Sequence, residues 1–223
     1  MFVKRKLQSY LLELSNYNVP NVYALPQMPL YMEQVINYLE DSLKPFEIDS
    51  ELITPSMINN YVKGKIIPAP VNKKYSKAHL TYLLEICSLK NILTLNEIMD
   101  IINYSTYKDV FDYYKNMQDE LISNISGAVK KSLTKIKKEN EDIELKKLAM
   151  ELALKANIYK TVSEKIISLL EEKKYEEIEK LKKDVLKKWF DWITSFSYSN
   201  LSFKMYRIPI VPLPQCDEIT QPA

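Results

Sequence analysis

Glycine is scarce in this sequence, with two glycines among 223 residues, where an average protein has about 7% glycine. Glycine supplies the positive φ angles that phosphate-binding loops, dinucleotide fingerprints and dense β-hairpins require. The shortage argues against a Rossmann-type nucleotide site and against hairpin-rich folds. Helices are therefore the expected elements.

Histidine and cysteine are scarce as well. The chain has one histidine, His79, and two distant cysteines, Cys87 and Cys216. These residues are too few for a zinc site with nitrogen and sulfur ligands, and they argue against a Ser-His-Asp arrangement. We expect no metal, no cofactor and no enzymatic activity.

Long apolar runs are missing too. No uncharged apolar stretch approaches the 18 or so residues that cross a bilayer, and residues 1–16 lack the pattern of a secretory signal. The chain is long enough to bury a core without disulfides. We expect a cytoplasmic protein with reduced thiols and no membrane partner.

Charge is unevenly distributed along the chain. Residues 1–53 carry four basic and seven acidic groups, whereas residues 54–90 carry six lysines and one glutamate, a net charge of +5. The remaining residues balance at zero. A basic segment inside a nearly neutral protein is typical of a phosphate-binding surface, although a solvated lysine-rich face has the same composition.

The first half of the sequence predicts short helices separated by prolines. Apolar spacing favours helices over residues 2–16 and 30–43. Thr54-Pro55 is a helix start signal for a third helix ending near Lys63. Gly64 suits a left-handed position after it. The following proline-bounded segment, residues 66–75, is expected to be an extended turn, and Ser76 and Thr94 are expected to cap two more helices.

The second half predicts a helical bundle. Three apolar stripes cover residues 110–136, 145–169 and 178–196, with turns expected at residues 137–142 and 171–175. The heptad pattern is loose, which favours antiparallel packing within a bundle over an extended coiled coil. Residues 201–223 contain four prolines and predict an extended tail.

Residues 53–102 carry the most information about function. Their order is a short capped helix, Ile66-Ile67-Pro68, a basic loop ending in Tyr75-Ser76, and two further helices. This order resembles the winged helix-turn-helix domain of MerR-type regulators. Residues 25–100, with Pro29-Leu30-Tyr31-Met32, are also similar to the YkrK-like family of bacterial domains of unknown function.

The MerR-like resemblance implies roles for particular residues. The recognition helix of that family corresponds to residues 56–61, and its phosphate contacts correspond to Lys73 and Lys74. Independently of the family, asparagine suits adenine edges and lysine suits phosphates or guanine. The predicted DNA-contact set is Thr54, Ser56, Asn59, Asn60, Tyr61, Lys63, Lys65, Lys73, Lys74, Tyr75 and Lys77.

Other notable residues have more ordinary interpretations. We expect His79 to be a partly exposed surface or capping residue and Cys87 to be a buried thiol. The alternating charges of residues 171–183 are typical of an exposed helix with i,i+4 pairs. An aromatic cluster is expected in the bundle core, with a ligand pocket or subunit contact as the alternative: Trp189, Phe190, Trp192, Phe196, Tyr198, Phe203 and Tyr206.

Together these patterns predict an all-α protein. Its expected parts are an N-terminal helix and connector (1–24), a MerR-like winged helix-turn-helix (25–105), a helical dimerisation or sensor bundle (106–200) and a tail (201–223). The expected function is sequence-specific binding of double-stranded DNA by a homodimeric transcriptional regulator, with an unknown effector or protein partner at the bundle. The alternative is a non-catalytic adaptor whose basic domain docks on an acidic protein.

Overall fold

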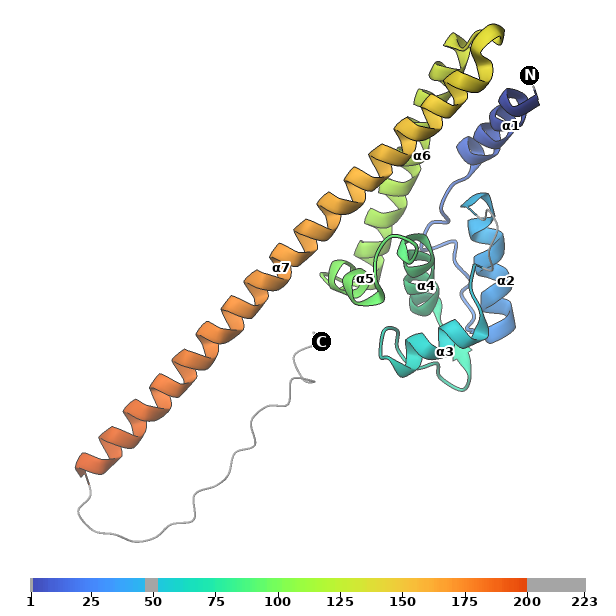
Figure 1. The fold of residues 1–223 in the computed structure, drawn as a ribbon. Coiled ribbons are helices and arrows are strands. Elements are labelled where there is room, and N and C mark those ends of the chain that lie inside the picture. The colour runs from blue at the N-terminus through green and yellow to red at the C-terminus, as the bar shows by residue number, and fades with distance from the viewer. Residues whose placement is uncertain (1, 47–51, 200–223) are drawn as a thin grey trace. The chain divides into compact units, whose positions relative to one another are not determined.

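The computed structural model describes residues 2–46 and 52–199 and is mostly helical, as the sequence predicts (Figure 1). Two short strands, β1 (Leu30–Tyr31) and β2 (Lys74–Tyr75), accompany the helices. The helices are α1 (Phe2–Asn16), α2 (Met32–Leu43), α3 (Pro55–Lys63), α4 (Lys77–Leu89), α5 (Leu95–Ile102), α6 (Tyr107–Lys135) and α7 (Glu141–Ser199), with single 3-10 turns at Lys44–Phe46 and Lys138–Asn140.

Contacts divide the chain into two compact units, residues 1–170 and 171–223, and α7 runs through the boundary. The predicted boundary at residue 105 does not coincide with this division. Helix α6 packs against both α1 and α4, which places it in the same unit as the predicted DNA-binding segment.

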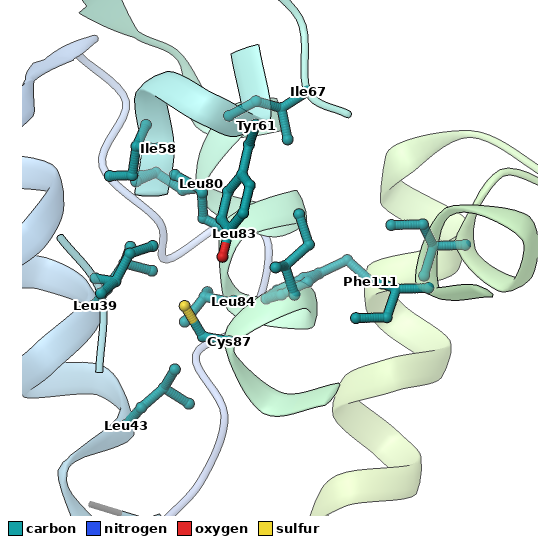
Figure 2. Packing of buried hydrophobic residues seen from close by; sticks show 14 of the residues in the cluster. Leu39, Leu43, Ile58, Tyr61, Ile67, Leu80, Leu83, Leu84, Cys87 and Phe111 are labelled. Carbon is teal, nitrogen blue, oxygen red and sulfur yellow. The ribbon is translucent and has the colours of Figure 1, made fainter. Parts of the chain in front are cut away.

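Helix α4 is the centre of the first unit. Every residue from His79 to Cys87 except Tyr82 is buried. Figure 2 shows leucines of α4 meeting side chains from three other helices: Leu39 of α2, Ile58 of α3 and Phe111 of α6. Since each of these residues is almost fully buried, α4 fixes the positions of the surrounding helices. The prediction that Cys87 is a buried thiol is confirmed.

The predicted helix starts are capped as expected. The Thr54 hydroxyl accepts a hydrogen bond from the Met57 N–H at 3.1 Å, which satisfies one free donor of the first turn of α3. At α5, Thr94 and Glu97 form a reciprocal capping box. These short helices therefore begin where the sequence predicts.

Helix α1 packs along α6 at a second, smaller apolar cluster. Leu11 meets Val129 and Leu133 there. At the edge of this contact, the Lys130 ammonium donates to the Ser15 hydroxyl at 3.0 Å.

Helix α7 corrects the predicted bundle. The turn expected at residues 171–175 does not exist, because α7 is one helix of 59 residues. The reason lies in the sequence: residues 141–199 contain neither glycine nor proline, and the pair Lys173–Glu177 supports the helix across the expected turn.

The aromatic cluster is not a bundle core where the structure describes it. Trp189, Phe190 and Trp192 are exposed by 53%, 70% and 60%. The side chains of Phe196 and Tyr198, together with Phe203, Tyr206 and Cys216, lie outside the described residues. Within the described part of the chain, no helix meets the length and apolarity needed to cross a bilayer.

Glu85 is a buried acid in the middle of α4. It is 1% exposed, and within the described residues neither of its carboxylate oxygens has a hydrogen-bond partner. Burial raises the pKa of Glu85 from 4.5 to about 8. Near neutral pH the folded protein therefore holds this carboxyl mainly in its uncharged form.

This shift predicts an unusual pH dependence of stability. Between about pH 4.5 and pH 8 the folded state binds more protons at Glu85 than the unfolded state does, so stability falls as pH rises through this range. Glu85→Gln removes the titrating group and should flatten the decline, which we expect to be on the order of 3–4 kcal/mol between pH 5 and pH 8. Urea unfolding of the wild type and the variant at pH 5 and pH 8 measures the decline in the free energy of unfolding. An equally steep decline in Glu85→Gln would contradict the raised pKa of Glu85.

Candidate nucleic-acid interface

Helix α3 has one buried and one polar face. Ile58 and Tyr61 are buried in the core (Figure 2). The opposite face is exposed and carries four of the residues predicted to contact DNA: Ser56, Asn59, Asn60 and Lys63. The helix thus offers two amides, a hydroxyl and an ammonium group to a partner.

The chain leaves α3 through a Schellman turn whose left-handed residue is a lysine. The Ile66 N–H donates to the Tyr61 carbonyl at 2.8 Å, and the Lys65 N–H donates to the Val62 carbonyl at 3.1 Å. Lys65 has a φ of 56°, whereas Gly64 has a φ of −75°. The helix ends at Lys63 as predicted, but the prediction that Gly64 takes the left-handed position is wrong, because Gly64 is the C-cap residue and the left-handed residue is Lys65, one position later.

The predicted extended turn contains a tight β-hairpin. The Val71 N–H donates to the Lys74 carbonyl at 3.1 Å, and the Lys74 N–H donates back to the Val71 carbonyl at 3.0 Å. The two residues between them, Asn72 and Lys73, have φ angles of 51° and 62°. Two consecutive residues with positive φ form a type I′ turn, which matches the twist of the paired strands.

Backbone strain gathers in this one segment. Among the described non-glycine residues, positive φ angles occur only at Lys65, Asn72 and Lys73. Asparagine tolerates this conformation, but a lysine there costs roughly 1–2 kcal/mol relative to its ordinary conformation. Strain that persists at two lysines of a basic loop points to a function that requires those lysines.

Strand β2 fixes the base of the hairpin. It pairs antiparallel with β1, so that Leu30 faces Tyr75 and Tyr31 faces Lys74. The Lys74 ammonium lies over the Tyr31 ring, 4.9 Å from its centre, at a distance suited to cation–π attraction. Sequence reasoning missed Tyr31 as a positioning residue, since only strand pairing brings the two residues together.

His79 ties the hairpin segment to the start of α4. The Nδ1 atom of His79 accepts a hydrogen bond from the Ser76 N–H at 3.0 Å. The proton of the neutral ring is therefore on Nε2, which donates a hydrogen bond to the Pro68 carbonyl at 3.1 Å. Burial lowers the pKa of His79, although its bonds to the backbone act in the opposite direction. His79 is 5% exposed, so its predicted capping role is confirmed and its predicted surface position is wrong.

The remaining predicted contact residues differ in their exposure. Lys65 and Lys73 are exposed, and Thr54, Lys74 and Lys77 are half-buried. Tyr61 and Tyr75 are buried, with exposed fractions of 6% and 3%. Because the side chains of these two tyrosines are buried, they are not part of the exposed surface.

The surface carries positive charge without neighbouring acids in sequence. Residues 54–84 contain five lysines and no aspartate or glutamate, and the next acid, Glu85, is buried. No cluster of potential metal ligands occurs among the described residues. The arrangement is therefore suited to binding an anionic partner through lysines and amides.

Comparison with known proteins gives one family match. Residues 20–120 match the model of a family described as a domain of unknown function (DUF1836). No curated protein matches the chain, and no solved structure does. The matched region contains α2 to α5, both strands and the first part of α6, so the whole basic surface lies within the residues that match this model.

The strain at Lys73 predicts a gain in stability on substitution. Lys73→Gly removes the penalty of a positive φ and should raise the free energy of unfolding by about 0.5–1 kcal/mol. Lys74→Gly is the matched control, because Lys74 is extended in β2 and glycine there should lower stability by a similar amount. Urea unfolding compares both variants with the wild type, and a loss of stability in Lys73→Gly would show that the position is unstrained.

Proposed function

We propose that the exposed face of α3 and the Val71–Lys74 hairpin together bind double-stranded DNA, in the manner of a MerR-like winged helix-turn-helix transcriptional regulator. The observation that carries this proposal is the pair of strained lysines in an acid-free segment beside an exposed Asn-Asn pair. In this arrangement α3 is the recognition helix and the hairpin is the wing.

The two parts of the surface have different chemistry and therefore different tasks. Asn59 and Asn60 each carry a donor and an acceptor, which match the major-groove edge of adenine. Lys65 and Lys73 project from tight turns, and their ammonium groups suit phosphates, whose contacts position a protein without reading sequence. Tyr31 holds Lys74, the next residue after Lys73, at the base of the hairpin.

The links between the two parts are short and specific. Seven residues separate the end of α3 at Lys63 from the hairpin at Val71. Within this connection, Ile67 is buried and the Pro68 carbonyl is bonded to His79. The wing is thereby held by the same core that seats the recognition helix, which reduces the ordering cost of binding.

A regulator of this type is proposed to act as a homodimer. A single short recognition helix covers only a few base pairs, and high specificity requires a second half-site, about 34 Å or a multiple of it away. We therefore expect an operator with an inverted repeat.

The wing lysines provide the first test of DNA binding. The double variant Lys73→Ala with Lys74→Ala should weaken binding to specific and random duplexes alike, and the slope of log affinity against log salt should shrink by roughly 0.9 for each lost phosphate contact. Lys146→Ala with Lys165→Ala removes the same charge from exposed positions of α7 outside the proposed interface and should leave the slope unchanged. Equal slopes in all three proteins would exclude the wing from the interface.

The recognition helix provides the second test. Asn59→Ala and Asn60→Ala should each relax the preference at one base pair by about 1–3 kcal/mol while leaving random-sequence binding nearly intact. The wild type first selects its preferred duplex from a random pool. Affinities of each protein for single-base variants of that duplex then measure the preference at each base pair. Weak binding to every duplex, with no preferred sequence, would instead favour an adaptor whose basic surface docks on an acidic protein.

A further inference from the structure

A cavity lies at one end of the core of the first unit, between α1, α2, α4 and α6. Its volume is about 300 Å³. The inner wall consists of buried side chains: Leu14 of α1, Leu43 of α2, Cys87 of α4 and Ile122 of α6. In Figure 2, Leu43 and Cys87 lie at the end of the core opposite Ile67. The cavity is therefore at the other end of α4 from the hairpin and the proposed DNA contacts.

The partly exposed residues that line the cavity, and so mark its mouth, are mostly apolar as well. Phe46, Leu121 and Ile125 are exposed by 37%, 51% and 49%. About ten water molecules would fill a space of this size, and most of them would meet hydrocarbon instead of a hydrogen-bond partner. Displacing such water by an apolar group is favourable. The lining thus suits a molecule that is largely apolar.

Two side-chain amides form the polar part of the lining. Asn91 follows the end of α4, and Gln118 is half-buried in α6. Each amide has a donor and an acceptor, and neither takes part in a hydrogen bond with the described residues. They come three and four residues after Ser88 and Tyr114, whose hydroxyls are hydrogen-bonded at 2.7 Å. Both amides therefore lie at the same end of the contact between α4 and α6.

The other heteroatoms at the cavity are occupied or unreactive. The Ser88 hydroxyl donates its proton to the Leu84 carbonyl at 3.0 Å. Burial raises the pKa of Cys87 to about 12, so its thiol stays protonated and acts as an apolar wall. None of the described lining residues is charged, and the nearby Lys90 ammonium donates to the Leu52 carbonyl. A charged ligand would enter without a counter-ion, which is costly.

We propose that this cavity binds a small neutral amphiphile, whose alkyl chain lies against the aliphatic wall and whose uncharged head forms hydrogen bonds with Gln118 and Asn91. The space of about ten water molecules holds roughly ten non-hydrogen atoms. A head that both donates and accepts, such as a primary amide, matches the two protein amides. The inference goes beyond the proposed function and requires no DNA.

An amphipathic helix of another protein is the main rival for this cavity, because apolar grooves also bind such helices. A helix is about 10–12 Å wide with its side chains. The cavity, by contrast, has room for only about two aliphatic side chains at its volume of about 300 Å³. Its size thus favours a small molecule.

The test titrates the full-length, nitrogen-15-labelled protein with octanamide and follows its amide NMR spectrum. We expect one saturable site, with the largest shifts in the side-chain amides of Gln118 and Asn91. Hexanamide, which is two methylenes shorter, should bind about tenfold more weakly because it buries less apolar surface. Octanoate has the same chain length and a charged head, and it should bind at least about tenfold more weakly than octanamide.

Two variants locate the head of the ligand. Gln118→Leu keeps the size of the side chain but removes its hydrogen bonds, and it should weaken octanamide binding about tenfold. Asn116→Leu is the matched control, because Asn116 is exposed on α6 and does not line the cavity. This control should bind octanamide as the wild type does. Circular dichroism checks that both variants retain their helix content.

The possible results are distinct. Saturable binding that weakens in Gln118→Leu but not in Asn116→Leu supports the proposal. The absence of saturable binding, or equal affinities of the wild type and Gln118→Leu, overturns it. Octanoate that binds as tightly as octanamide contradicts a neutral ligand, and shifts that are largest on the exposed apolar residues of α7 contradict this cavity. Since no DNA is present, a failure here leaves the DNA-binding tests untouched.

Discussion

The burial of α4 on almost every side is the constraint on which the first unit depends. Leu80, Leu83 and Leu84 lie among α2, α3 and α6, so none of these helices can move without exposing apolar surface. The same helix begins at the Ser76–His79 cap, which also holds the Pro68 carbonyl. The core therefore fixes both α3, which we propose as the recognition helix, and the base of the hairpin, so the proposed interface depends on the packing of α4.

The basic segment, residues 54–90, contains features that lower the stability of the folded protein. Lysine occupies the left-handed position after α3 and the second residue of the hairpin turn, where glycine fits without strain. Glu85 adds a second cost, because it is buried without a hydrogen-bond partner among the described residues. Under the proposed function, the strained lysines contact phosphates.

The sequence predicts local features better than tertiary ones. The starts of α3, α4 and α5 follow from Thr54, Ser76 and Thr94, because capping depends on a few neighbouring residues. The pairing of Tyr31 with Lys74 depends on contact between distant segments, and no local pattern indicates it. The prediction of a turn near residue 171 is wrong. A run of polar residues can either end a helix or form the exposed face of a longer helix, and the absence of glycine and proline is the signal that indicates the longer helix.

The most direct test of the central claim is a lysine-protection experiment on the wild-type chain. Acetylation of lysines, followed site by site with mass spectrometry, compares the free protein with its complex with a duplex. If α3 and the hairpin bind the duplex, we expect strong protection of Lys63, Lys65 and Lys73 and unchanged labelling of the exposed α7 lysines Lys180 and Lys182. Protection confined to α7, or spread evenly over all exposed lysines, would contradict the claim that α3 and the hairpin form the DNA-binding surface.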